Sequence, residues 1–105
     1  MQDKIWKVRT VKNYPEAHSH LIIGKVLNIE TSSVRLDCKT YHFGKVVHTA
    51  KDVLVGQEMV RIIPWSRIEI INELPDDFDY VKSSVTADKT GKVVIKDGKY
   101  AIPLG

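Results

Sequence analysis

Residues 58–74 read EMVRIIPWSRIEIINEL, which is two aliphatic runs interrupted at Pro64. Both runs are rich in isoleucine, and β-branched residues are typical of strands. Proline cannot donate a hydrogen bond to a β-ladder, so the first strand is expected to end here. No Asn-Gly or Asp-Gly pair lies between the runs, which argues against a two-residue hairpin. The stretch predicts a strand over 58–63, one 3₁₀ turn, and a second strand over 67–74.

A hairpin is predicted upstream of this stretch. Residues 21–29 form a β-rich run that ends in the polar cluster 30–33, and residues 34–38 then alternate between apolar and charged side chains. Alternation with a period of two indicates a half-buried strand, and the pattern continues less cleanly to residue 43. Gly24 lies inside the first run, where a glycine indicates close backbone approach or a sharp bend of the kind that small barrels need.

The N-terminal residues 5–11 also alternate, with Trp6 and Val8 on one side and Lys7 and Arg9 on the other. An amphipathic helix is the alternative, but the β-branched residues and the period favour a strand. Residues 13–16 are expected to end it. Residues 44–57 show no clear period and are interpreted as a connecting loop or a ragged strand extension.

The composition changes after residue 74. Residues 75–80 are an acidic linker with two aromatic side chains, which we expect to attach it to the core. Three short runs follow, over 84–87, 92–96 and 99–102, and they predict a β-meander. Asp-Gly between β-rich runs, here at Asp97, is a strong hairpin signal. Because so small a piece does not fold alone, it is expected to pack on the preceding strands.

Length and composition indicate one ordinary globular domain. The chain has 105 residues, of which 43% are hydrophobic and 28% charged. No apolar run approaches the ~20 residues needed to span a bilayer. The single cysteine, Cys38, cannot form an internal disulfide, and no secretory leader is recognisable, so a cytoplasmic location is the simplest expectation.

The charge is mildly basic, at +3, and the excess lies near the N-terminus. Residues 1–12 carry Lys4, Lys7, Arg9 and Lys12 against one aspartate, whereas the five lysines and five aspartates of residues 76–105 cancel. Such an excess suits a polyanionic partner, and it equally suits a solvated face. The sequence leaves both open.

Two short motifs occur within residues 5–74. The first has a glycine, hydrophobic positions and an acidic residue before a short loop, and it comprises Gly24, Val26, Glu30, Val34 and Leu36. The second joins two hydrophobic strands through a very short turn, over residues 62–68. Together they resemble the two motifs of the Sm-like (LSm) family of RNA-binding ring proteins. The resemblance implies an all-β fold: an SH3-like small open barrel (the Sm-like fold) over 1–74. Residues 75–105 would add a linker and an appended C-terminal β-meander packed on the same domain.

The resemblance also implies a non-catalytic, homo-oligomeric ring that binds single-stranded RNA. Rings of this family pair the strand before the turn with the strand after it in the next copy. The implied subunit interface comprises Met59, Val60, Ile62, Ile68, Ile70 and Ile71. The implied RNA-binding residues are Glu30, Ser32 and Ser33 from the first loop with Pro64, Trp65, Ser66 and Arg67 from the second. Lys7 and Arg9 are expected to add salt-sensitive phosphate contacts.

The first loop departs from the family pattern, since it holds neither an aromatic residue nor an asparagine. Trp65 could stack on a base or could pack in the core or at a subunit contact. A structural or protein-interaction ring that has lost the nucleic-acid site is therefore the alternative function. A monomeric SH3-like domain that binds peptides is a third.

Other chemistry is weakly indicated. His18 and His20 form a His-x-His pair without a third ligand at a recognisable spacing, so we expect no metal site. Cys38 alternates with Leu36 and is interpreted as a small buried hydrophobic residue. No phosphate loop, dinucleotide fingerprint or nucleophile elbow occurs. We therefore expect neither a cofactor nor an enzyme.

Overall fold

The computed structural model describes residues 3–12 and 17–105, so the predicted end of the first strand at 13–16 lies outside the described residues. The described chain is all-β and antiparallel. No helix in it is long and apolar enough to cross a membrane. Its strands are β1 (Ile5–Thr10), β2 (Ser19–Ile29), β3 (Ser33–Phe43), β4 (Leu54–Val55), β5 (Met59–Pro64), β6 (Ile68–Leu74), β7 (Ser84–Ala87), β8 (Val93–Lys96) and β9 (Ala101–Pro103), with 3₁₀ turns η1 (Ala50–Asp52) and η2 (Trp65–Arg67).

The larger sheet has the order β4-β3-β2-β1-β6, and β5 also pairs with β3. β5 lies beside the first half of β3, from Ser33 to Cys38, and β4 lies beside the second half, at Tyr41 and His42. The predicted hairpin is confirmed as β2 and β3, and the predicted proline corner is confirmed as β5, η2 and β6. The turn η2 therefore connects strands at opposite edges of the sheet, because β5 pairs with β3 and β6 pairs with β1.

The region 44–57 is neither a simple loop nor a long strand extension. It contains η1, whose N-cap Thr49 and Asp52 form a capping box, and the short strand β4. Val53 between them is buried in the core. Val47, which is partly buried, packs against the same core. The segment has no clear period because it is held by these two separate side chains and by only two residue pairs of the β3–β4 ladder.

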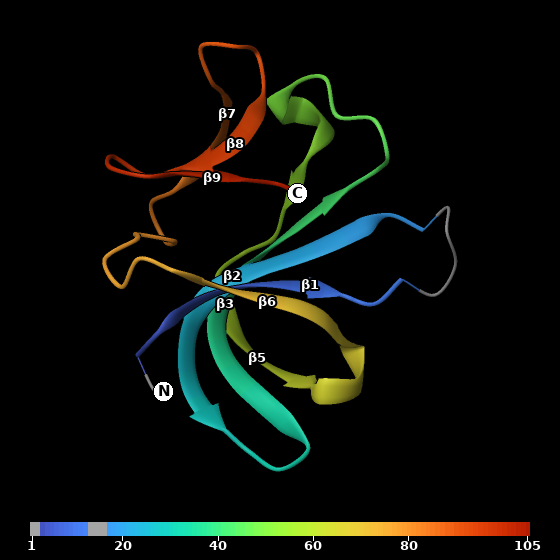
Figure 1. The fold of residues 1–105 in the computed structure, drawn as a ribbon, viewed down its shortest axis with the longest axis vertical. Helices are drawn as coiled ribbons and strands as arrows, with labels where there is room; N and C mark the ends of the chain where they lie inside the picture. Colours follow the sequence, from blue (N-terminus) through green and yellow to red (C-terminus); the bar gives the residue numbers. More distant parts are fainter. Residues whose placement is uncertain (1–2, 13–16) are drawn as a thin grey trace.

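The strands β1, β2 and β3 contribute side chains to a core on each face of the sheet. Burial is therefore almost continuous in β1 and in residues 21–24 of β2, whereas β3 keeps the predicted alternation over most of its length. One face carries a core that includes Trp6, Val8 and Leu36, and this core is enclosed by β5, η2 and β6. The opposite face carries a second core that includes Ile23 and Tyr41. The meander of β7, β8 and β9 lies at the other end of the molecule from η2 (Figure 1). Its buried side chains complete the second core.

The aromatic residues of the acidic linker anchor the meander, as the sequence predicts. Phe78 and Tyr80 are buried in the second core together with Ile95 of β8. The hydroxyl of Tyr80 also donates a 2.6 Å hydrogen bond to a carboxylate oxygen of Asp37 on β3. The meander and the larger sheet therefore share one core instead of forming two independent ones.

Gly24 has the role predicted for it. A Cβ atom at this position would overlap the carbonyl oxygen of Asp37 and would lie 2.5 Å from the Cβ of Cys38. Both obstacles belong to the neighbouring strand β3, so only glycine allows β2 and β3 to approach this closely.

Candidate functional site

The two loops expected to bind RNA lie against each other. The backbone N–H of Trp65 donates to the carbonyl oxygen of Ser32 at 3.1 Å, and its indole Nε1 donates to the carbonyl oxygen of Glu30 at 2.9 Å. Pro64 ends β5 in an extended conformation and places Trp65 at the start of η2. The fold therefore brings the β2–β3 loop and the proline corner together.

The carboxylate of Glu30 is used within its own loop. It accepts a hydrogen bond from the Asn28 side-chain amide at 3.0 Å and one from the Ser33 hydroxyl at 3.5 Å. These bonds stabilise the polar turn that was recognised in the sequence. Ser32 and Ser66 are exposed beside it, so the surface of this junction offers hydroxyl and carbonyl groups to solvent.

The contacts of Trp65 bear on whether its indole stacks on a base or packs in the protein. The indole is half-buried and packs against the core of β1, β2 and β3, as do Ile68 and Ile71 of β6. Its only polar atom is engaged by Glu30. Packing is therefore an observed role of the ring, and only its remaining exposed part is accessible to a base.

A pocket adjoins η2 and is rich in basic groups. We call it the arginine pocket, a pocket of about 240 Å³ lined by Thr10, His20, Ile22, Arg61, Ile62, Ile63, Pro64 and Arg67. Arg61 comes from β5 and Arg67 ends η2, so the two guanidinium groups reach the pocket from either side of the proline corner. The lining residues, all within the described chain, include no aspartate or glutamate.

His20 is the most perturbed group in this pocket. Burial, followed by the charges of His42, Arg61 and Arg67, lowers its pKa from 6.5 to about 4, so the imidazole is neutral at physiological pH. Its ring stacks on that of His42, with the centroids 4.1 Å apart. The hydroxyl of Thr10 donates to the backbone carbonyl of His20 at 3.3 Å and ties β1 to β2 beside the pocket.

Lys7 and Arg9 do not join either loop. Lys7 is buried, and its ammonium donates a 2.7 Å hydrogen bond to the carbonyl oxygen of Gly105, while Arg9 reaches the carbonyl oxygen of Leu104 at 3.5 Å. Burial and the charges of Arg9 and Lys92 lower the pKa of Lys7. The alternation in β1 is as predicted, but the side that carries Lys7 faces the C-terminal segment. A buried ammonium that is already bonded is poorly placed to contact a phosphate.

The residues expected at a subunit interface divide into two groups. Met59, Val60, Ile62 and Ile70 have 43–58% of their surface exposed. Ile68 and Ile71 are only partly exposed, because they pack against the core. In the described chain, β5 has a ladder only with β3, and β6 only with β1, so each strand has one edge without a partner. Leu54 and Val55 of β4 extend the exposed apolar edge of β5.

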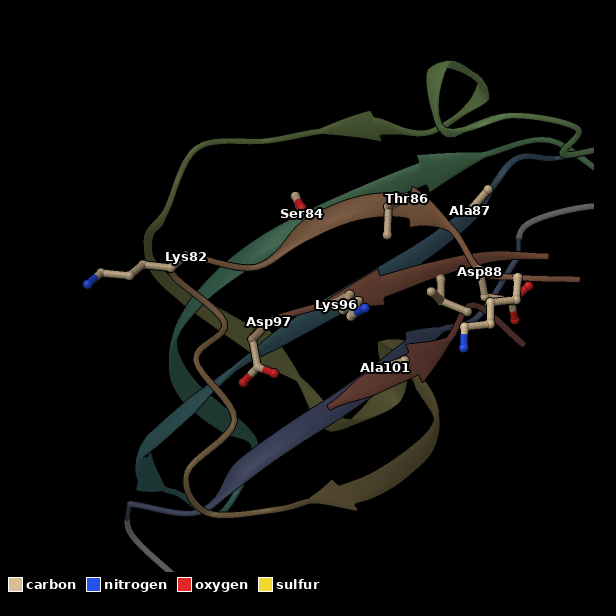
Figure 2. A pocket seen from close by; sticks show the side chains of 10 residues that line it. Lys82, Ser84, Thr86, Ala87, Asp88, Lys96, Asp97 and Ala101 are labelled. Atoms are coloured by element: carbon tan, nitrogen blue, oxygen red, sulfur yellow. The ribbon is translucent and has the colours of Figure 1, made fainter. Parts of the chain in front are cut away.

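Another hollow, of about 450 Å³, lies on the outer face of the meander. Figure 2 shows it, with Asp88 and Asp97 at its two ends and the side chain of Lys82 extending away from it. Asp88 accepts hydrogen bonds from the backbone N–H groups of Thr90 and Lys92, and Asp97 accepts them from Asp79 and Lys99. Its carboxylates therefore stabilise turns, and this open surface offers no convergent chemistry.

Sequence reasoning did not find the arginine pocket. Arg61 was interpreted only as part of an aliphatic strand, and His20 was paired with His18 instead of with His42. The described residues contain no group of three or more potential metal ligands. Cys38 is fully buried, as expected, and burial raises its pKa to about 11. Comparison with known proteins found no family model, no curated protein and no solved structure that matches this chain.

Proposed function

We propose that this chain is a non-catalytic SH3-like barrel of the Sm-like type that assembles into a homo-oligomeric ring and binds single-stranded RNA. The observation that carries the proposal is the position of η2. This one turn joins the two strands that have unpaired edges. It also brings Trp65 next to the β2–β3 loop and Arg67 next to the end of β1.

The assembly part rests on the edges of β5 and β6. An exposed edge strand presents unpaired backbone groups, and natural proteins protect such edges with charge, proline or a partner. Here the edges carry Val60, Ile62 and Ile70, all well exposed. Pairing β5 of one copy with β6 of the next is a heterologous contact, which closes into a ring when the rotation between copies allows it.

The RNA part rests on the basic and aromatic groups around η2. Single-stranded nucleic acids bind to proteins through a positively charged groove and through aromatic surfaces on which bases stack. Arg61 and Arg67 supply positive charge, the exposed part of Trp65 supplies an aromatic surface, and Ser32 and Ser66 supply hydroxyl groups. In a ring these groups would recur once per subunit.

The oligomeric state is tested by the native mass of the purified protein. Val60→Lys and Ile70→Lys place a charge on each edge without removing a buried side chain, and both are expected to lower the mass to that of one subunit. Val46→Lys is the control, because Val46 is also well exposed but lies outside β5 and β6. A wild-type protein of one-subunit mass would refute the ring.

RNA binding is tested by titrating the assembled protein with oligo-U and oligo-A at low salt. We expect saturable binding that weakens as salt is added, and Arg67→Gln should reduce it. Trp65→Ala should reduce it further if a base stacks on the ring, with the native mass unchanged. Absence of binding up to about 100 µM protein, the weak limit of non-specific nucleic-acid binding, would remove RNA from the proposal.

The second candidate is a structural or protein-interaction ring without a nucleic-acid site. It is favoured by the hydrogen bond that engages the indole of Trp65 and by the packing of the ring on the core. Under this candidate, Trp65→Ala dissociates the assembly, and the intact assembly binds neither oligonucleotide.

A further inference from the structure

A pocket beside the meander is formed by three segments that are far apart in the sequence. We call it the lysine pocket. It has a volume of about 270 Å³ and is lined by Phe43, Gly44, Lys45, Val47, Gly91, Lys92, Val93, Leu104 and Gly105. These residues come from the end of β3 and the segment after it, from the β7–β8 turn, and from the residues after β9. None of them belongs to η2, β5 or the β2–β3 loop, so the pocket is separate from the proposed RNA surface.

The floor of the lysine pocket is apolar. Phe43, Val93 and Leu104 are buried members of the second core, and Val47 packs against that core. Side chains that belong to a packed core are held in place by their neighbours. The pocket is therefore a preformed apolar surface, and a ligand that covers it gains free energy by removing it from water.

The β7–β8 turn holds the opposite side of the pocket. The N–H of Gly91 donates to the carbonyl oxygen of Asp88 at 3.0 Å, and the carbonyl oxygen of Lys92 accepts from the N–H of Asp88 at 2.8 Å. Gly91 has a φ of +85°, in the left-handed region, and a Cβ there would meet no atom within 4 Å. The turn is thus fixed by its backbone while its glycine leaves the edge of the pocket open.

The charged groups of the lining are two exposed lysines, Lys45 and Lys92. Among the described residues, neither ammonium forms an ion pair, and the lining contains no aspartate or glutamate. Asp88 lies close to Lys92, but its carboxylate accepts hydrogen bonds from the N–H groups of Thr90 and Lys92 and does not line the pocket. The two lysines therefore remain available to an anion.

The surroundings of the pocket add to its positive charge. Lys7 and Arg9 line a neighbouring hollow, which shares Gly105 with the lysine pocket. Burial, followed by the charges of Arg9 and Lys92, lowers the pKa of Lys7, so these cations are close enough to repel one another. An anion bound at this end of the molecule would relieve part of that repulsion.

The combination of floor and charge specifies the ligand class. A bare inorganic anion would leave the apolar floor uncovered, and a neutral alkyl group would leave the lysines unused. The volume of about 270 Å³ is below the ~300–1,000 Å³ typical of sites for drug-sized molecules, so the ligand is compact. A short alkyl chain that carries one carboxylate meets all three requirements, because ammonium groups form charge-assisted hydrogen bonds with carboxylates.

We propose that the lysine pocket binds a short unbranched aliphatic carboxylate. The alkyl chain lies on the apolar floor, and the carboxylate lies beside the ammonium groups of Lys45 and Lys92. This inference goes beyond the proposed function, since it assigns a small-molecule site that requires neither a ring nor RNA.

The first test titrates the full-length protein with butanoate, hexanoate and octanoate at pH 7 and constant ionic strength. NMR follows the methyl groups of Val47, Val93 and Leu104. We expect saturable shifts and at least a tenfold tighter affinity for octanoate than for butanoate, because each buried CH₂ adds about fourfold. No saturable shift, or equal affinities for the two acids, would overturn the proposal.

The methyl groups of Leu54 report adsorption to apolar surface in general, because Leu54 is 67% exposed on β4 and does not line the pocket. They are expected not to saturate over the same range. Saturation at Leu54 with the same affinity as at Leu104 would also overturn the proposal.

The second test removes the charge of the pocket with the double variant Lys45→Gln/Lys92→Gln. Both positions are exposed, so the fold is expected to persist. Octanoate should bind at least fivefold more weakly, whereas binding of 1-octanol should not change. Lys89→Gln is the matched control, because Lys89 is an exposed lysine of the same β7–β8 turn that does not line the pocket. Equal octanoate affinity in the double variant and the control would refute the assigned role of the lysines.

Discussion

The imidazole rings of His20 and His42 stack face to face, with their centroids 4.1 Å apart and their planes inclined by 12°. The two residues are direct neighbours across the β2–β3 ladder, so the stack is a cross-strand pair. Because Arg61 and Arg67 lie close by, protonating His20 would add a third cation to a partly buried cluster. This relationship makes the stability of the fold sensitive to pH.

Acidification should destabilise the protein between pH 6.5 and about 4. The folded pKa of His20 is about 4 and the unfolded value is 6.5, so the unfolded chain binds more protons in this window and stability falls as the pH drops. Some carboxylates have a lowered pKa in the folded protein, such as Asp88 and Asp97. They reduce the stability only when the pH falls below their ordinary pKa of 3.8, which lies outside this window. Urea midpoints measured from pH 7.5 to 4.5 check this.

His20→Gln should flatten that pH dependence, whereas His18→Gln, an exposed position two residues away, should leave it unchanged. A wild-type urea midpoint that stays constant over the window, or a loss of stability that persists in His20→Gln, would contradict the assigned role of His20.

Gly24→Ala should destabilise the fold by about 3 kcal/mol or more, because the added methyl group meets backbone atoms of β3 that cannot move aside. Gly98→Ala is the matched control, since a Cβ there meets nothing within 4 Å. Urea unfolding of the two variants measures the difference. Similar midpoints for both would show that β2 and β3 are not as closely apposed as described.

Cys38 should be unreactive in the native protein. Its side chain is fully buried and its pKa is raised to about 11, so the nucleophilic thiolate is both scarce and shielded at neutral pH. Labelling with a disulfide-exchange reagent is expected to be slow in buffer and rapid in concentrated urea. Rapid labelling under native conditions would mean that the β3–β5 region opens readily.

Ile95→Ala should cost about 2–5 kcal/mol, because Ile95 is fully buried in the core between the meander and the larger sheet. Lys96→Ala, at the exposed neighbouring position, should be nearly neutral. Since the core is shared, circular dichroism and tryptophan fluorescence should report one coincident transition in both variants. Separate transitions would indicate that the meander unfolds independently.

Much of the architecture could be predicted from local patterns. The period of two in residues 34–38, the proline corner at Pro64 and the Asp-Gly pair at Asp97 each depend on the preferences of a few adjacent residues, and the structure contains the corresponding elements. The position of Lys7 could not be predicted, because its partner Gly105 lies at the opposite end of the chain.

The arginine pocket could not be predicted because it depends on a register shift in the β2–β3 ladder. Next to the turn, Asn28 pairs with Arg35, and the register then shifts by one before Val26 pairs with Leu36. Without that bulge, the pairing near the turn would place His20 opposite Phe43. The position of a bulge depends on how the two strands pack against each other, so it cannot be predicted from the pattern of either strand alone.

Outside residues 44–57, the strands, the turns and the need for glycine at position 24 follow from the sequence, since they depend on backbone and side-chain preferences over a few residues. Which side chains meet follows from the packing of the whole chain. His20, Arg61 and Arg67 come together because strand register and η2 place three distant segments around one pocket. Register is a property of paired strands, and it exists only when the sheet has formed.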